Sequence, residues 1–216
     1  TQSAGTGTTL VSGAQTYSGA FSFTGSALTV NAVLSATTVS VVNAGVFTTG
    51  AGGDITSTAG AFAQTGAGTN SLAGDITTAD ANISFATAVS LKGAVALNTG
   101  AGAGNITFRS TLDGAQNLNL TAGTGNIVFT GLAGTTRLGA VNIANATNVT
   151  AVGFQAASLT QAAGIGTTTF NGPLNFNAGA GLSVSAANIT INDTVTTTGT
   201  GTVTLNPGTL LTIVSA

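Results

Sequence analysis

The sequence predicts an all-β protein whose chain winds into a parallel β-solenoid of about ten turns, with roughly 21 to 23 residues in each turn. Two observations predict this fold. A short Asn-Ile-x-Phe unit recurs at a near-constant interval, and apolar and polar residues alternate within each unit. A chain that returns to the same place after every unit stacks like residues on one another, which is how a solenoid is built.

The recurring unit opens with an asparagine. Its copies start at Asn82, Asn105, Asn126, Asn148 and Asn188. The one gap in this series is filled at the expected place by Thr-Thr-Phe at 168–170. Upstream, Asp54 and Asp75 open a Gly-Asp-Ile-Thr variant of the unit, so we expect these carboxylates to share the register of the asparagines.

Each unit continues with a second alternating segment and a glycine-rich corner. Examples of the second segment are 118–121, 141–143 and 174–177, and a typical corner is 121–125. Each unit therefore predicts two or three short strands separated by turns. Helices are not expected, because Gly, Thr, Asn and β-branched residues are poor helix formers and no apolar stripe of helical period is present.

The apolar positions of successive units predict a core of stacked columns. One column contains Ile83, Ile106 and Ile127, and a second contains Phe85, Phe108 and Phe129. Burying each such side chain contributes roughly 1.5 to 3 kcal/mol. The contacts between rungs, rather than any single rung, are then what stabilises the fold.

The five asparagines that open the units predict a ladder. Asparagine tolerates the backbone conformations of a corner, and stacked amides can hydrogen-bond to one another along the axis. We call Asn82, Asn105, Asn126, Asn148 and Asn188 the asparagine ladder. The functional alternative is N-glycosylation, because all of these except Asn126 begin an Asn-x-Ser/Thr sequon.

The composition argues against catalysis and against nucleic acid as a partner. The 216 residues include no His and no Cys, which removes the usual general base, thiolate nucleophile and soft metal ligands. Only 4% of the residues are charged, and Lys92, Arg109 and Arg137 are too few to neutralise a run of phosphates. We therefore expect no enzyme, no cofactor and no nucleic-acid partner.

The five aspartates are the remaining candidates for a catalytic pair or a metal site. They are Asp54, Asp75, Asp80, Asp113 and Asp193. Their scatter along the chain favours corner and turn residues, as in the Asp113-Gly114 pair. Calcium-binding β-rolls require an aspartate in every short turn, which five aspartates cannot supply.

The first 50 residues differ from the remainder. They lack the Asn-Ile-x-Phe unit, so they predict either irregular first rungs or a strand-exchange segment, with the regular solenoid covering 51–216. Residues 1–53 carry no charge, but Phe21–Thr24 and Leu28–Asn31 alternate apolar with polar, which favours strands over a membrane-spanning helix. Thr1 is either a processed terminus or the start of an excised segment.

The motif Gly-x-Gly-Asn-Ile-x-Phe occurs at 102–108 and again at 123–129. It resembles the repeats of filamentous-haemagglutinin-like secreted bacterial adhesins, and the resemblance extends over about residues 50 to 216. It implies a right-handed parallel β-helix that lies outside the cell.

These observations predict a secreted structural protein that polymerises end to end into an extracellular filament, for surface attachment or a biofilm matrix. The last residues form an apolar strand without a polar cap, and little charge is present to oppose association. The partner is then another copy of the chain, with glycans or inert surfaces as further partners of the rod. The expected assembly residues are Thr1, Gln2, Leu10 and Val11 at one end and Leu210, Leu211, Ile213 and Val214 at the other.

Two alternatives stay open. The chain could be a monomeric adhesin or a spacer segment of a larger surface protein. It could also bind ice, because threonine clusters occur at 167–169 and 194–198. The threonines do not recur at one fixed position of the rung in the sequence alignment, which argues against a lattice-matched face.

Overall fold

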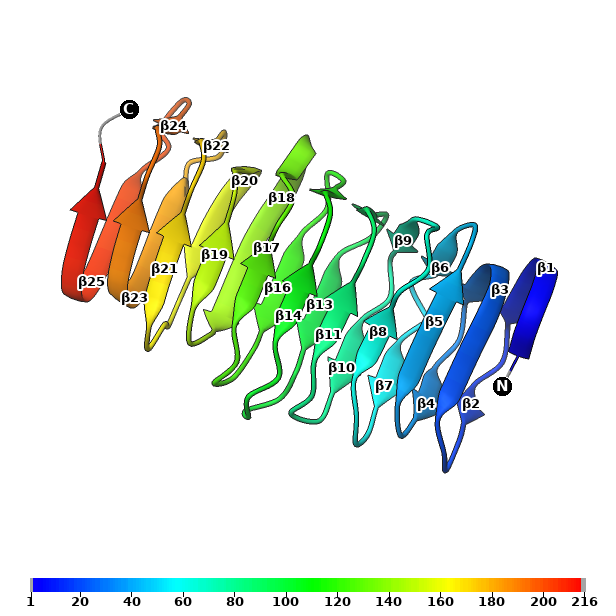
Figure 1. Cartoon of the computed structure of the whole chain (residues 1–216). Helices are drawn as coiled ribbons and strands as arrows, with labels where there is room; N and C mark the ends of the chain where they lie inside the picture. Colours follow the sequence, from blue (N-terminus) through cyan, green and yellow to red (C-terminus); the bar gives the residue numbers. More distant parts are fainter. Residues whose placement is uncertain (1, 215–216) are drawn as a thin grey trace.

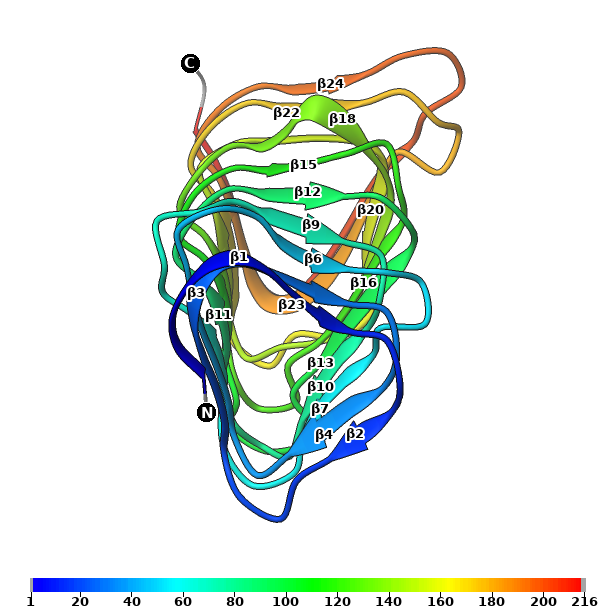
Figure 2. The same ribbon diagram turned by 90° about the vertical axis from the view of Figure 1, so that its right-hand side faces the viewer.

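The computed structural model describes residues 2–214 and the side chains of residues 5–214. It is an elongated parallel β-solenoid of about ten turns, with roughly 21 residues per turn (Figure 1). No helix occurs in this part of the chain. Viewed from the N-terminal end, the chain runs clockwise as it recedes, so the solenoid is right-handed (Figure 2). The predicted fold class is thereby confirmed.

The solenoid has three faces, which Figure 2 shows on the left, at the top and on the right. Face 1, on the left, contains β5 (Val39–Asn43), β8 (Phe62–Gln64), β11 (Ile83–Phe85), β14 (Ile106–Phe108), β17 (Ile127–Phe129), β19 (Val149–Ala151) and β21 (Thr167–Phe170). Face 2, at the top, contains β6 (Phe47–Thr49), β9 (Asn70–Leu72), β12 (Val89–Leu91), β15 (Leu112–Asp113), β22 (Leu174–Phe176) and β24 (Val195–Thr197). Face 3, on the right, contains β2 (Gln15–Thr16), β4 (Leu34–Ala36), β7 (Ile55–Ser57), β10 (Ile76–Thr78), β13 (Val95–Asn98) and β16 (Leu118–Thr121).

Six longer strands bend around a corner and belong to two faces. β1 (Gln2–Val11) and β3 (Phe21–Val30) pass from face 1 to face 2, β18 (Ala133–Asn145) and β20 (Phe154–Gln161) from face 2 to face 3, and β23 (Leu182–Ile191) and β25 (Val203–Ile213) from face 3 to face 1. The strand pairings of the described chain are all parallel.

The core consists of the predicted columns. Ile83, Ile106 and Ile127 lie in register, as do Phe85, Phe108 and Phe129, and these six side chains are at most 1% exposed. Ring centroids are 5.6 Å apart between Phe85 and Phe108 and 5.2 Å apart between Phe108 and Phe129. Alternation explains the geometry, since successive residues of a strand point inward and outward by turns.

Corners require glycine where the chain passes close to the next rung. Gly134 follows the start of β18 with a φ of +94°, and a Cβ at this position would lie 1.9 Å from the carbonyl oxygen of Gln155. Both features exclude other residues, because a left-handed backbone and a close approach are each tolerated by glycine alone.

A buried polar cluster interrupts the apolar core at the corner between faces 1 and 2. Gln64 donates from Nε2 to Oδ1 of Asn43 at 2.8 Å, and the Nδ2 of Asn70 donates to the Oγ1 of Thr87 at 3.1 Å. The Oγ1 of Thr87 in turn donates to Oε1 of Gln64 at 3.3 Å. Because Asn43, Gln64 and Asn70 are each 1% exposed, these bonds replace the water that burial removes.

One assignment of the repeat units is confirmed and one is wrong. Thr167–Phe170 forms β21 between β19 and β23, so the gap in the repeat is filled as predicted. The register expected for Asp54 and Asp75 is wrong, because they precede β7 and β10 on face 3, whereas the asparagine ladder precedes the strands of face 1.

The residues before 51 wind around the same three faces. β3 pairs with β5 and β6, and Phe23, Leu28 and Phe47 are fully buried. Irregular pairing is confined to β1, whose register with β3 shifts between Gln2 and Gly5 and between Gly5 and Thr8. Thr1 lies outside the described residues.

Candidate functional site: the two ends of the solenoid

The C-terminal end exposes the apolar interior of the last turns. A hollow of about 330 Å³ is lined by side chains of all three faces. Its apolar lining residues are Ile191, Val195, Val203, Leu205, Ile213 and Val214. Val203 is 48% exposed and Ile213 62%, although both occupy positions that are buried in the preceding rungs. Apolar side chains in such positions favour a partner that removes them from water.

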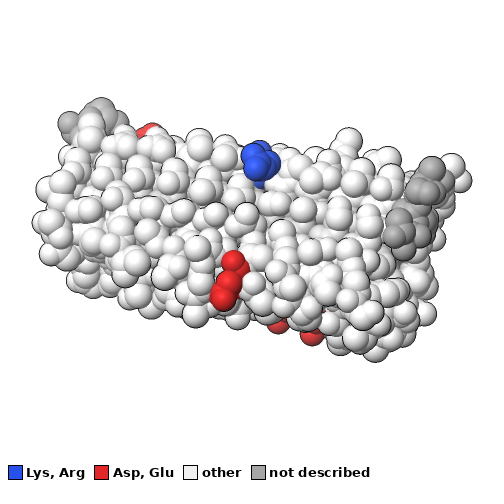
Figure 3. Space-filling model, turned by 60° about the horizontal axis from the view of Figure 1, so that its bottom comes forward, with Lys and Arg blue, Asp and Glu red and all other residues white. Residues whose placement is uncertain are grey.

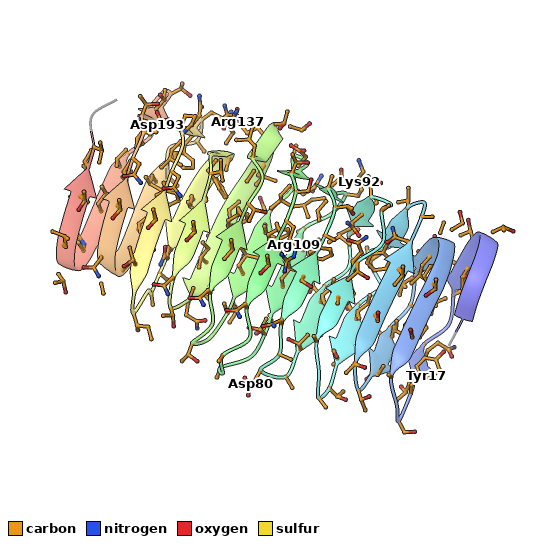
Figure 4. The ribbon with its side chains drawn as sticks, in the orientation of Figure 1. Tyr17, Asp80, Lys92, Arg109, Arg137 and Asp193 are labelled. Atoms are coloured by element: carbon orange, nitrogen blue, oxygen red, sulfur yellow. The ribbon has the colours of Figure 1, made fainter. Side chains whose placement is uncertain are left out.

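The N-terminal end has a second hollow, of about 400 Å³. Val11, Phe21 and Phe23 contribute its apolar lining, and Gln15 and Tyr17 its polar rim. The rings of Tyr17 and Phe21 lie 5.7 Å apart, and Tyr17 is at this end of the rod in Figure 4. The two ends thus each have a hollow bounded by residues of all three faces.

The predicted assembly residues divide into inward and outward positions. Val11, Leu211 and Ile213 align with buried residues of the adjacent rung, so they belong to the interior columns. Leu10 aligns with Thr29 and Leu210 with Asn188, so these two leucines hold outward positions, each 56% exposed, and Leu10 also borders the N-terminal hollow. The backbone of Gln2 pairs with Phe23, and Val214 donates its N–H to the carbonyl of Ile191.

Sequence reasoning missed the residues of β24 and of the first half of β25, together with Phe21, Phe23 and Tyr17. These residues are distant from the termini in the sequence, and the winding of the chain brings them to the ends of the rod. The repeat length could have identified them, because they lie within about one turn of the terminal strands.

Charged residues make up 4% of the chain, and they are sparse on the face of the rod that Figure 3 shows. Among the residues that line the two end hollows, Asp193 is the one charged side chain. Its Oδ1 accepts the N–H of Thr194 at 2.6 Å. Association of the two ends therefore brings no like charges together among the described residues.

Four of the five aspartates, Asp54, Asp75, Asp80 and Asp113, accept a backbone N–H from the next rung. Asp54 accepts the N–H of Asp75 at 2.9 Å, Asp75 that of Ala96 at 2.7 Å, and Asp113 that of Thr136 at 2.8 Å. Residues 2–214 contain no group of three or more His, Cys, Asp or Glu side chains that could hold a metal ion. Over the same residues, no helix is long and apolar enough to cross a membrane.

Hydrogen bonds run along the asparagine ladder. Oδ1 of Asn82 accepts the N–H of Asn105 at 2.8 Å, and the same bond links Asn126 to Asn105 at 2.8 Å and Asn148 to Asn126 at 3.2 Å. The side-chain amides add bonds of 3.2, 3.0 and 2.8 Å in the same order. Thr167 occupies the next rung, so that Asn188 bonds to Thr167 and is not joined to Asn148 directly.

Replacing Asn126 by alanine is expected to lower the free energy of unfolding by about 1–2 kcal/mol, because Asn148 loses the acceptor for its backbone and side-chain N–H groups. Urea denaturation followed by circular dichroism measures this loss. Asn177→Ala, at an exposed site in the turn after β22, provides the control. Equal stability of the two variants would mean that the ladder contributes no net stabilisation.

Face 1 also carries a column of hydroxyl groups that the alignment of the repeat units within the sequence did not reveal. The outward residue at the centre of each rung is Ser or Thr in all rungs except two, which have Ala63 and Val128. From the N-terminal to the C-terminal end, the column contains Ser22, Ser40, Ala63, Ser84, Thr107, Val128, Thr150, Thr169, Thr190 and Thr212. The expectation that threonine does not recur at a fixed position is therefore wrong.

The sequence matches no protein-family model, and no curated protein or solved structure is significantly similar to it.

Proposed function

We propose that the chain is a secreted structural protein whose rods join end to end into an extracellular filament. The observation that carries this proposal is the hollow at each end of the interior columns. The exposed Ile213 and Val203 line one hollow, and Phe21 and the buried Phe23 line the other. A head-to-tail contact of this kind does not close on itself, so it generates a filament.

The register of face 1 supports a continuous stack. The column that ends at Leu211 begins at Phe21, and the column that ends at Ile213 begins at Gln2, which pairs with Phe23. The pairing of β1 with β3 begins at Phe23. At Phe21 and Ser22, the edge of β3 that faces the N-terminal end of the rod therefore pairs with no described strand. A second copy would therefore align its Leu211 with Phe21 and extend the sheet by parallel strand addition.

The setting of this filament is the outside of the cell. The resemblance of the Gly-x-Gly-Asn-Ile-x-Phe motif to adhesin repeats supports that location, and the sparsely charged sides of the rod suit contact with glycans or inert surfaces. Attachment to a surface or formation of a biofilm matrix would then depend on the length of the filament.

The test is light scattering on the 216-residue chain over a range of concentrations, with negative-stain electron microscopy of the same samples. We expect the mass to rise with concentration and filaments to form. Ile213→Asp should abolish this growth, because it places a carboxylate in the contact. Ile165→Asp is the matched control, since Ile165 is 70% exposed in the turn between β20 and β21, on the side of the rod. A chain that stays monomeric at every concentration would refute the proposal.

A second candidate is a rod that works as an adhesin or spacer segment of a larger surface protein. It is favoured by the same register, because preceding or following coils of one polypeptide would cover the ends as well as a second copy would. The intact mass of the native polypeptide separates the two candidates.

A further inference from the structure

The C-terminal half of face 1 is a regular array of short uncharged side chains. In the rungs of β17, β19, β21 and β23, the central column is Val128, Thr150, Thr169 and Thr190. On each of these strands, the residue directly before the first inward residue of face 1 belongs to a second column. This column contains Asn126, Asn148, Thr167 and Asn188. The third column, after the strands, contains Thr130, Val152, Asn171 and Asn192. No Lys, Arg, Asp or Glu occurs in any of the three columns.

The backbone beneath this array is in register. β17 pairs with β19, β19 with β21, and β21 with β23 without a bulge between 127 and 191 on this face. On this face, the inward residues of the same strands are at most 1% exposed. The asparagine ladder fixes one edge of the array, where Asn148 is held from both sides by Asn126 and Thr167.

The spacing of the array follows from its strands. Neighbouring rungs lie about 4.8 Å apart, and outward residues two positions apart along a strand lie about 6.6 Å apart. Threonine is stiff at χ1, so each copy presents its hydroxyl and its methyl group in a repeatable orientation. An array of hydroxyls and methyls repeated about every 4.8 Å is close to the oxygen spacing of hexagonal ice, so it suits an ordered layer of water.

We propose that face 1 from β17 to β23 binds the surface of ice crystals through this ordered water. The absence of charge from these three columns favours ice over an ionic ligand, because charged groups hold hydration water in other arrangements. Arg109, at the end of β14, is the charged residue of face 1 and marks the boundary of the array (Figure 4). A sugar polymer is less well matched, since Tyr17 is the one exposed aromatic ring of the described chain and lies at the N-terminal end.

The test measures thermal hysteresis and the inhibition of ice recrystallisation with the 216-residue chain. We expect the freezing point to fall below the melting point and crystal growth to slow. The double variant Thr150→Tyr/Thr169→Tyr should lose most of both effects, because bulky rings break the flat array. Thr160→Tyr, at an outward position of β20 on face 3, is the control and should retain them. Circular dichroism melting of all three proteins reports whether they are folded.

Three results would overturn the proposal. The wild-type chain could show neither effect, the double variant could match the wild type, or Thr160→Tyr could lose activity to the same extent while still folded. The Ile213→Asp variant keeps this test separate from assembly, because it leaves the array unchanged and should retain activity on ice.

Discussion

Replacing Phe108 by alanine is expected to lower the free energy of unfolding by about 3–5 kcal/mol. Phe108 is 1% exposed and stacks between Phe85 and Phe129, with ring centroids 5.6 and 5.2 Å away. The substitution leaves a cavity in the middle of a column that cannot collapse, because the strands above and below are fixed by their hydrogen bonds. Urea denaturation followed by circular dichroism measures the change.

The control for this variant is Thr107→Ala, one residue earlier on the same strand. Thr107 points outward, so its substitution should change stability by no more than about 0.5 kcal/mol. A loss for Phe108→Ala no larger than that for Thr107→Ala would contradict the stacked core.

Replacing Gln64 by leucine is expected to destabilise the fold by about 1–3 kcal/mol, although leucine is apolar and the site is buried. Gln64 lies in a column between Val41 and Phe85, where an apolar residue would be the simpler choice. Its amide, however, donates to Asn43 at 2.8 Å and to the carbonyl of Gly66 at 2.8 Å. Leucine leaves both acceptors buried without that donor.

Gln155→Leu provides the comparison, since Gln155 lies at an outward position of β20 on face 2. Thermal unfolding of the two variants side by side measures the difference. If Gln64→Leu were as stable as the wild type, the buried polar cluster would contribute nothing to the fold.

The solenoid was predictable because its signal is repeated. Ile106 and Phe108 carry little information alone, but the same pair one turn earlier and one turn later identifies a column. The interval between like residues then indicates a coil, and alternation indicates strands. The repetition does not, however, indicate to which face a given strand belongs.

The faces were confused because their local patterns are alike. Asp54-Ile55 and Asn82-Ile83 both open a strand with a polar residue followed by isoleucine, yet one lies on face 3 and the other on face 1. Corner lengths vary between turns. An alignment of the repeat units on one motif can therefore assign a strand to the wrong face, and nothing in the sequence reveals the error.

The same variation hid the hydroxyl column. Thr150 pairs with Thr169 and Thr169 with Thr190, which are 19 and 21 residues apart. Only the hydrogen-bonded register shows that these threonines occupy one position of the rung. The ends were predictable from their terminal location, whereas Phe21 and Val203 reach them through the winding of the chain.

The most direct measurement of the central claim is the axial repeat of the filament, determined by cryo-electron microscopy or fibre diffraction. Continuous stacking of about ten turns predicts a subunit repeat near 50 Å and an uninterrupted strand spacing of about 4.8 Å along the filament axis. A filament whose strand spacing runs across its axis, or one in which rods associate side by side, would contradict end-to-end assembly.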